Sequence, residues 1–296
     1  MVQFVKSEQS IEKLFPKNSN FTFAGKQYRV IISGKPRPKK GECKTDIYIK
    51  AIDKNNEEIE LKISVKQSNA DFLENKISYN RAIEIFGKDM LSIIKASLFN
   101  LRIVFEEDCL VYFSSFGRTR AHTMKLGWKF ELMNKLNGEK SGLIIMSDEQ
   151  KMDVFAGINL PKDKRDCKVD DILIKDSGIA NYIIIKDKDV LTQKECLDSL
   201  ISIEEYSKNQ DIFFACKALN YRFDENKWDG PRPLAVFVEW YLNENNQLTA
   251  KLDFEHPFMK NGNESGENLV NILKELGIKE FDDLKSFLSP DIKVHE

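Results

Sequence analysis

Two residues of opposite charge lie far apart in the sequence, but a predicted β-hairpin would bring them together. Asp46 begins a stretch in which polar and apolar residues alternate, residues 53–56 are typical of a turn, and the alternation resumes from Ile59 to Gln67. If the two stretches pair across this turn, Asp46 at the start of the first strand approaches Lys66 at the end of the second. A carboxylate and an ammonium group would then lie side by side.

This pair of groups suits metal-assisted hydrolysis of a phosphodiester. A carboxylate is a ligand for a hard divalent cation such as Mg²⁺, and a neighbouring ammonium group orients or deprotonates the attacking water and offsets charge that develops on the phosphate. In the second strand the period of two places polar residues on one face and apolar residues on the other: Glu60, Lys62, Ser64 and Lys66 against Leu61, Ile63 and Val65. We expect the apolar face to be packed and the polar face to carry chemistry or solvent.

The hairpin resembles the catalytic hairpin of the PD-(D/E)xK nucleases. Its segments KTDIYI, from Lys44, and KISVKQSNADF, from Lys62, are close in wording to those of type II restriction endonucleases. The resemblance implies that Asp46 is the metal-ligating aspartate and Lys66 the catalytic lysine. It also implies an α/β (α+β) fold with a PD-(D/E)xK core, in which helices flank a mixed central sheet.

The chain departs from this family's pattern at two positions. Ser64 stands where the family usually has Asp or Glu, and Thr45 replaces the usual proline. The second acid must therefore come from elsewhere, and the candidates are Glu60 within an alternative Glu60-Leu61-Lys62 motif, Glu42 before the first strand, and Glu8 or Glu12 in an N-terminal helix. We prefer Lys66 to Lys62 because the hairpin brings the far end of the second strand beside Asp46.

Basic clusters in three parts of the chain are candidates for contacts to DNA. Between Lys26 and Lys66 there are eleven Lys or Arg against six Asp or Glu, although the formal net charge of the whole chain is −2. Residues 114–129 and 221–233 combine cations with glycine or proline, and arginines in such loops suit contacts with phosphates or bases. In the third cluster, Trp228 would stack on or wedge between bases. The candidate DNA-binding residues are Lys35, Arg37, Lys39, Lys40, Gln67, Asn69, Arg118, Arg120, His122, Arg222, Lys227, Trp228 and Arg232.

The remaining pattern predicts alternating helices and strands around this hairpin. The expected elements are a helix from Ile11 to Phe15, strands within 21–33, a helix from near Ala70, a second hairpin over 101–113, and long paired strands near 235–242 and 248–254. Pro161 and a charged run interrupt the apolar periodicity between 157 and 169. We therefore expect a nuclease domain over 1–156 and a C-terminal α+β domain over 157–296 that recognises and clamps DNA.

Composition and missing motifs argue against other classes of protein. No apolar run approaches the roughly 18 to 20 residues of a membrane span, and the N-terminus lacks the apolar core of a signal peptide, so we expect a cytoplasmic protein without a membrane partner. The five cysteines are scattered without a CxxC pair, which speaks against a zinc site or a disulfide framework. Phosphate-loop, GxSxG and HExxH motifs are absent.

These features together predict a Mg²⁺-dependent endodeoxyribonuclease that cuts duplex DNA at specific sequences, as type II restriction enzymes do. A palindromic target would imply a homodimer. Two alternatives stay open. One is another nuclease of the same superfamily, with a role in repair, phage defence or CRISPR-associated cleavage; the other is a non-catalytic DNA-binding module, which Ser64 favours.

Overall fold

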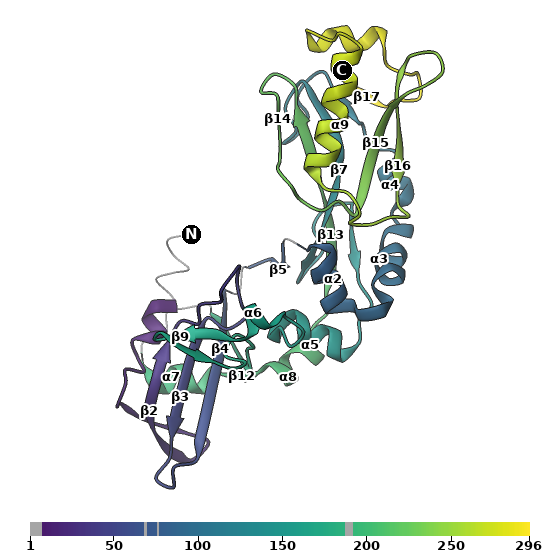
Figure 1. Ribbon diagram of the computed structural model, residues 1–296. Helices are drawn as coiled ribbons and strands as arrows, with labels where there is room; N and C mark the ends of the chain where they lie inside the picture. The colour runs from purple at the N-terminus through teal and green to yellow at the C-terminus, as the bar shows by residue number, and fades with distance from the viewer. Residues whose placement is uncertain (1–7, 68–69, 76, 187–191) are drawn as a thin grey trace. The chain divides into compact units, whose positions relative to one another are not determined.

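Residues 8–67, 70–75, 77–186 and 192–296 are described by the computed structural model, and over these ranges the fold is mixed α/β (Figure 1). The chain divides into two units, each made of two separate segments. Unit 1 contains Met1–Asp71 and Met146–Gln210, and unit 2 contains Phe72–Ile145 and Asp211–Glu296.

Unit 1 is built on a mixed sheet of six strands in the order β1-β2-β3-β4-β11-β12. These are β1 (Asn20–Phe23), β2 (Lys26–Gly34), β3 (Ile47–Ile52), β4 (Glu58–Gln67), β11 (Tyr182–Lys186) and β12 (Ile201–Ser202). Strands β1 to β4 form an antiparallel meander, whereas β11 runs parallel to β4. Residues 8–12 are helical, and the unit also holds a small hairpin of β9 (Cys167–Val169) and β10 (Ile172–Ile174), with helices α5 (Asp148–Ala156), α6 (Lys162–Arg165), α7 (Gln193–Asp198) and α8 (Ile203–Lys208).

The predicted central hairpin is confirmed. Ile47 pairs with Ile63 and Ile52 with Glu58. Between the strands, the Asp53 carboxylate accepts hydrogen bonds from the backbone N–H groups of Asn55 and Glu57 at 2.8 and 2.9 Å. This is the local turn chemistry of an aspartate, and it fixes the register of the whole hairpin.

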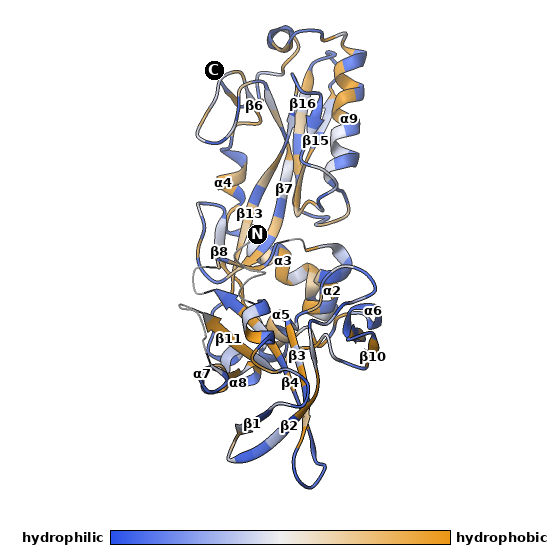
Figure 2. Cartoon of the chain, turned by 90° about the vertical axis from the view of Figure 1, so that its left-hand side faces the viewer, coloured by the Kyte–Doolittle hydropathy of each residue, from blue (hydrophilic) through white to orange (hydrophobic). Residues whose placement is uncertain are grey.

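The alternation along this hairpin produces the core of unit 1. Ile47, Ile49, Leu61 and Ile63 are fully buried on one face, where they pack with residues of the N-terminal helical segment and of α7. Strand β11 is hydrophobic along most of its length (Figure 2), as expected for a parallel strand covered on both faces. The opposite face of β3 and β4 is left to polar side chains.

The units do not coincide with the expected division between residues 156 and 157. Helix α5 and strand β11 lie in the second half of the chain, yet both belong to unit 1. The reason is the parallel pairing of β11 with β4, in which Ile184 lies opposite Val65. Parallel neighbours require a long crossover connection, and the first segment of unit 2 is part of that connection.

Unit 2 is organised around the long strand β7 (Thr123–Met133). Strands β14 (Lys227–Trp228), β13 (Phe213–Arg222), β7, β15 (Val236–Leu242) and β16 (Leu248–Asp253) follow one another in that order. Short strands extend this sheet: β5 (Phe72–Glu74) and β6 (Val111–Tyr112) pair with β7, β8 (Ser141–Leu143) pairs with β13, and β17 (Val294–His295) pairs with β6. The helices are α2 (Tyr79–Phe86), η1 (Gly87–Asp89), α3 (Met90–Phe99), α4 (Arg102–Glu106), α9 (Gly262–Glu275) and η2 (Phe281–Ser286).

The strands expected near 235–242 and 248–254 are confirmed as β15 and β16, but two other expectations in unit 2 are wrong. The hairpin predicted over 101–113 is replaced by α4 and the short strand β6, because Phe105 packs from a helix against Trp128 and Phe254. The helix predicted from near Ala70 begins later: β5 comes first, and the Ser78 hydroxyl caps α2. None of the helices in the described ranges has the length and apolar character to cross a membrane.

Gly127 tests the packing of β7 against β15. Its φ is +145°, and a Cβ atom there would lie 2.4 Å from the Val236 carbonyl oxygen. We expect Gly127→Ala to lower the free energy of unfolding by roughly 2–4 kcal/mol, because backbone strain and steric overlap add. Gly138→Ala is the matched control, since Gly138 also has a positive φ, +81°, but has open space around it. Equal thermal stabilities of the two variants would contradict this close approach.

Candidate functional site

The carboxylate of Asp46 lies where β3 separates from β4. Its backbone N–H donates to the Ile63 carbonyl at 2.8 Å, and its Oδ2 accepts from the Val65 N–H at 2.8 Å. Asp46 itself lies in a bend just before β3, and the pairing of β3 with β4 begins at Ile47 and Ile63. The Lys66 ammonium acts to lower the pKa of Asp46, so the two charged groups lie near each other.

A distant turn fixes the chain as it enters β3. The N–H groups of Lys44 and Thr45 donate to the Gly178 carbonyl at 3.0 and 3.3 Å. Gly178 itself has no space for a side chain, because a Cβ atom would lie 2.2 Å from the Lys164 carbonyl oxygen. The position of Asp46 thus depends on the segment between α6 and β11.

Burial raises the pKa of Asp46 above its ordinary value, although the Val65 N–H and the Lys66 ammonium act in the opposite direction. The carboxylate of Glu8 also raises this pKa, so it lies near enough for the two acids to repel. A desolvated carboxylate with a second acid beside it favours the approach of a cation. This places Glu8, from the N-terminal helical segment, among the candidate acids that the structure brings toward Asp46.

Ser64 is buried, and its hydroxyl has no hydrogen-bond partner among the described residues. A buried hydroxyl without a partner is unfavourable for folding. The Thr45 hydroxyl, immediately before Asp46, is unpartnered in the same sense. Each of these two hydroxyls could accept or donate a hydrogen bond to a ligand that reaches it.

Of the other acids that the sequence offered, Glu60 lies away from Asp46. Glu60 accepts a hydrogen bond from the Tyr48 hydroxyl at 2.6 Å and stands opposite Lys50, four residues along β4 from Ser64, or about 13 Å in an extended strand. Glu42 is exposed in the loop before β3. Glu12 lines the neighbouring cavity described below.

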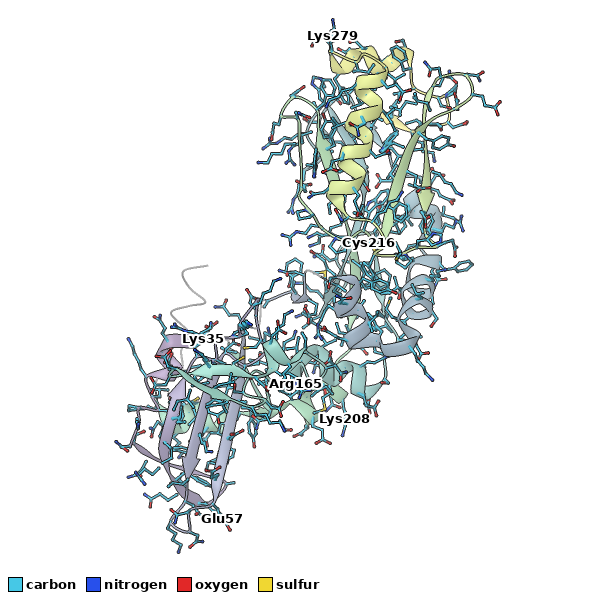
Figure 3. The ribbon with its side chains drawn as sticks, viewed as in Figure 1. Lys35, Glu57, Arg165, Lys208, Cys216 and Lys279 are labelled. Atoms are coloured by element: carbon cyan, nitrogen blue, oxygen red, sulfur yellow. The ribbon has the colours of Figure 1, made fainter. Side chains whose placement is uncertain are left out.

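A charged cavity adjoins the Asp46 site. It has a volume of about 380 Å³, and its lining includes three cations and four acids: Lys35, Arg37, Lys168, Glu8, Glu12, Asp170 and Asp171. The Lys35 ammonium pairs with Glu8 and lowers the pKa of Asp46, so it lies close to both acids. Lys35 is at the opposite end of the sheet from Glu57, which lies in the β3–β4 turn (Figure 3).

The loop that carries the first basic cluster is held by backbone contacts. Arg37 and Lys168 exchange backbone hydrogen bonds at 2.8 and 3.0 Å, and the Lys39 N–H donates to the Asp163 carbonyl. The side chains of Arg37, Lys39 and Lys40 remain exposed. Lys168 was not predicted from the sequence, because its position beside Arg37 depends on the packing of β9 against the loop.

The oxygen donors at this site fit a hard divalent cation. Asp46, Glu8 and the Ser64 hydroxyl are the candidates, and Mg²⁺ commonly binds proteins through one or two carboxylates while water and substrate phosphate complete its coordination. Across the described ranges, no group of three or more His, Cys, Asp or Glu residues is arranged to hold a metal ion.

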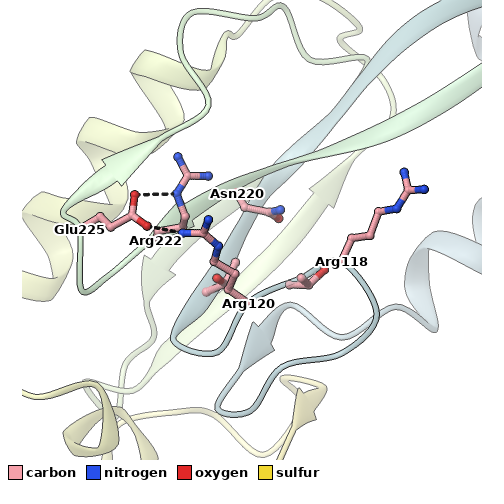
Figure 4. A pocket seen from close by; sticks show the side chains of 7 residues that line it. Arg118, Arg120, Asn220, Arg222 and Glu225 are labelled. Atoms are coloured by element: carbon pink, nitrogen blue, oxygen red, sulfur yellow. Dashed lines mark hydrogen bonds and ion pairs between the residues drawn. The ribbon is translucent and has the colours of Figure 1, made fainter.

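The second and third basic clusters meet in unit 2. Arg118, Arg120 and Arg222 line one pocket of about 310 Å³, together with Thr119, Thr123, Asn220 and Glu225 (Figure 4). The sequence identified the three arginines in two separate segments, and the pairing of β7 with β13, in which Thr123 lies opposite Arg222, brings these segments together. Glu225 and Asn220 were not predicted from the sequence, because no local pattern marks them.

The remaining candidates in unit 2 have mainly structural contacts. The Trp228 indole N–H donates to Asn263 at 2.8 Å, and its ring packs on Gly266 of α9. These contacts anchor the ring within its own unit, and a role of Trp228 in base stacking stays a prediction. His122 contacts Asp224 at 3.0 Å and stacks on Phe281.

Four further predicted residues complete the set. Lys227 is exposed in β14, Arg232 is half-buried, and Gln67 is half-buried at the end of β4. Asn69 lies outside the described residues. Of these residues, Gln67 comes directly after Lys66 in β4.

No protein-family model matches the chain, and comparison with curated proteins and with solved structures finds no match. The functional assignment therefore depends on this chain's own residues and their arrangement.

Asp46→Asn tests the burial of the carboxylate. Because the pKa of Asp46 is raised, the folded protein retains this proton to a higher pH than the unfolded chain, so stability falls as the pH rises from about 4 through the raised value. Asparagine keeps an oxygen for the Val65 N–H but carries no charge. We expect the variant to unfold at a higher temperature than the wild type near pH 8 and to lose this advantage below about pH 4. A lower unfolding temperature near pH 8 would show that burial does not disfavour the charged form of Asp46.

Ser64→Ala tests the unpartnered hydroxyl. Its removal should change the free energy of unfolding by less than about 0.5 kcal/mol, because no hydrogen bond within the protein is lost. Ser177→Ala is the matched control: this serine is also fully buried, but its hydroxyl accepts from the Cys167 N–H at 3.1 Å and donates to the Ile174 carbonyl at 2.9 Å. We expect the control to lose roughly 1–3 kcal/mol in chemical denaturation. Equal losses would show that the Ser64 hydroxyl is satisfied.

Proposed function

We propose that this protein is a Mg²⁺-dependent, sequence-specific endodeoxyribonuclease of the type II restriction kind, cytoplasmic, with its hydrolytic site in unit 1. The observation that carries the proposal is the hydrogen bond from Val65 to Asp46, which holds a desolvated carboxylate at the end of β4, near enough to Lys66 for the ammonium to lower its pKa. This is the juxtaposition of acid and lysine that the resemblance to PD-(D/E)xK nucleases implies.

The architecture of unit 1 also supports the proposal. A helical segment precedes an antiparallel meander, and α5 precedes a further strand that pairs in parallel with β4. The result is a mixed sheet flanked by helices, which is the type of core that the resemblance implies. In this proposal unit 1 cleaves DNA and unit 2 recognises it.

Each group has a distinct role in this proposal. Asp46 and Glu8 would hold the Mg²⁺ ion, which when bound polarises the phosphate and lowers the pKa of a bound water. Lys66 orients the attacking water and offsets charge on the phosphate. The Ser64 hydroxyl donates a hydrogen bond to a phosphate oxygen or a water, since the protein supplies no other partner among the described residues.

Three cations at the charged cavity beside Asp46 are candidates for contacts to the DNA backbone: Lys35, Arg37 and Lys168. Cations bind phosphates without reading the sequence. Four acids share the lining, so these contacts would come from the three side chains and not from the cavity as a whole. Glu8 pairs with Lys35. On binding of metal and DNA, Glu8 would contact the cation and Lys35 the phosphate, in place of their contact with each other. A palindromic target would in addition require a homodimer.

A second candidate function is a non-catalytic DNA-binding module. The observation in its favour is Ser64, which stands where the family usually has an acid. A related nuclease acting in repair, phage defence or CRISPR-associated cleavage would use the same site on other targets. The two nuclease alternatives differ in their products, because a restriction enzyme yields discrete fragments.

Lys66→Ala is the direct test. We expect Mg²⁺-dependent cleavage of mapped plasmid DNA to fall by at least about 100-fold, because the water loses its orienting group. Lys62→Ala is the matched control on the same face of β4, where the Lys62 ammonium donates to the Asp176 carbonyl at 3.2 Å. This control should keep most of the activity.

The outcomes separate the alternatives. Loss of cleavage in Lys62→Ala with retention in Lys66→Ala would support the Glu60-Leu61-Lys62 alignment instead. Binding of DNA without metal, with no cleavage by the wild type when Mg²⁺ is added, would support the non-catalytic module. General degradation of the plasmid in place of discrete fragments would support a nuclease without sequence specificity.

A further inference from the structure

The arginine pocket of unit 2 lies between two turns at one end of the sheet. Phe116 and Thr119 exchange backbone hydrogen bonds at 2.9 Å and hold Arg118 in the turn between them. The other turn follows β13, where the Asn226 N–H donates to the Phe223 carbonyl at 2.9 Å. Two turns from distant parts of the chain therefore present their side chains to one space.

The lining of this pocket offers both donors and acceptors. The carboxylate of Glu225 bridges Arg120, at 2.6 Å, and Arg222, at 3.3 Å (Figure 4). Asp229 pairs with the other side of Arg222 at 2.6 Å. The three arginines are thus balanced in part by two acids, which makes the site less suited to a bare phosphate, whose oxygens only accept hydrogen bonds at neutral pH.

Asn220 adds an acceptor that the protein does not use. Its Oδ1 is buried and has no hydrogen-bond partner among the described residues. The register of β13 against β7 shifts between Leu219 and Asn220, and such an irregularity re-aims the side chain that follows it. In Figure 4 Asn220 lies between Glu225 and Arg118, whose guanidinium has no ion-pair partner in the described part of the chain.

We propose that this pocket reads a G·C base pair of duplex DNA. In the major groove guanine presents two acceptors, O6 and N7, and cytosine presents the N4 amino donor. Arg118 and Arg120 would donate to guanine, while Asn220 Oδ1 or Glu225 accepts from cytosine. One arginine can bind both O6 and N7 of guanine, whereas in an A·T pair the adenine N6 donor separates the two acceptors. A phosphate offers no donor to the oxygens of Asn220 and Glu225. The inference rests on the proposed action on duplex DNA and adds the base pair that is recognised.

The test uses full-length protein carrying Lys66→Ala, which separates binding from cleavage, and a library of DNA duplexes with a randomised central segment. Binding is carried out without metal, and the bound duplexes are recovered and sequenced. The same is done for the protein that also carries Arg118→Gln or Arg120→Gln. Both arginines are exposed, so neither change disturbs the core. We expect a bound motif that contains a G·C pair, and a loss of about tenfold to hundredfold in preference at that one position in the two arginine variants.

Arg102→Gln is the matched control, because this exposed arginine of unit 2 pairs with Glu106 and lies outside the pocket. It should leave the motif unchanged. At the affected position, 7-deazaguanine should weaken binding by a similar factor, whereas inosine, which keeps the major-groove edge of guanine, should not.

Two results would overturn the inference alone: a uniform loss of affinity over all sequences in the arginine variants, which indicates phosphate contacts, or a motif that neither variant relaxes. If the Lys66→Ala protein binds no duplex at all, the proposed function and this inference are both overturned. Cleavage of plasmid by the wild type into discrete fragments, with an unrelaxed motif, keeps the proposed function and rejects the base-pair assignment.

Discussion

The hydrogen bond from the Val65 N–H to the carboxylate of Asp46 lies where β3 and β4 of unit 1 cease to pair through their backbones. In a continuing antiparallel ladder, this N–H would pair with a backbone carbonyl of the neighbouring strand. Here the side chain takes that place, and β3 begins only at Ile47. Strand β4 nevertheless continues to Gln67, because β11 pairs with it on the other side. The polar residues at the end of β4 therefore lie at a point that β3 no longer covers.

The same point depends on a partner strand from far along the chain. Strand β11 supports the end of β4 only because it runs parallel to it, and a parallel neighbour cannot follow through a tight turn. The connection between the two strands contains the first segment of unit 2 as well as α5. An insertion at this place leaves the hairpin intact, since the pairing of Ile47 with Ile63 is set by the turn at Asp53.

Sequence reasoning succeeded where the determinants are local. Alternation and the Asp53 turn were sufficient to predict the hairpin, which brings Asp46 near Lys66. It failed where distant contacts decide: the short apolar run from Leu101 to Phe105 fits a strand or a helix equally, and packing against Trp128 selects the helix. The meeting of Arg120 with Arg222, and the approach of Lys168 to Arg37, require strand registers and loop contacts that no local pattern encodes.

The polar face of β3 and β4 has two halves that differ in hydrogen bonding, and this difference locates the site better than the motif does. Toward the turn, the side chain of Glu60 is bound by Tyr48, and Asn181 bonds the backbone of Glu60 and Lys62 at 2.9 and 2.7 Å. Those groups satisfy one another and leave nothing for a ligand. At the other end, the Ser64 hydroxyl is unpartnered and Asp46 is desolvated, and both features oppose folding. Unfavourable features that cluster in a sheet are typical of positions kept for binding or catalysis. This contrast is the reason that the proposal places the site at the end of β4 near Ser64, and not at the Glu60-Leu61-Lys62 segment.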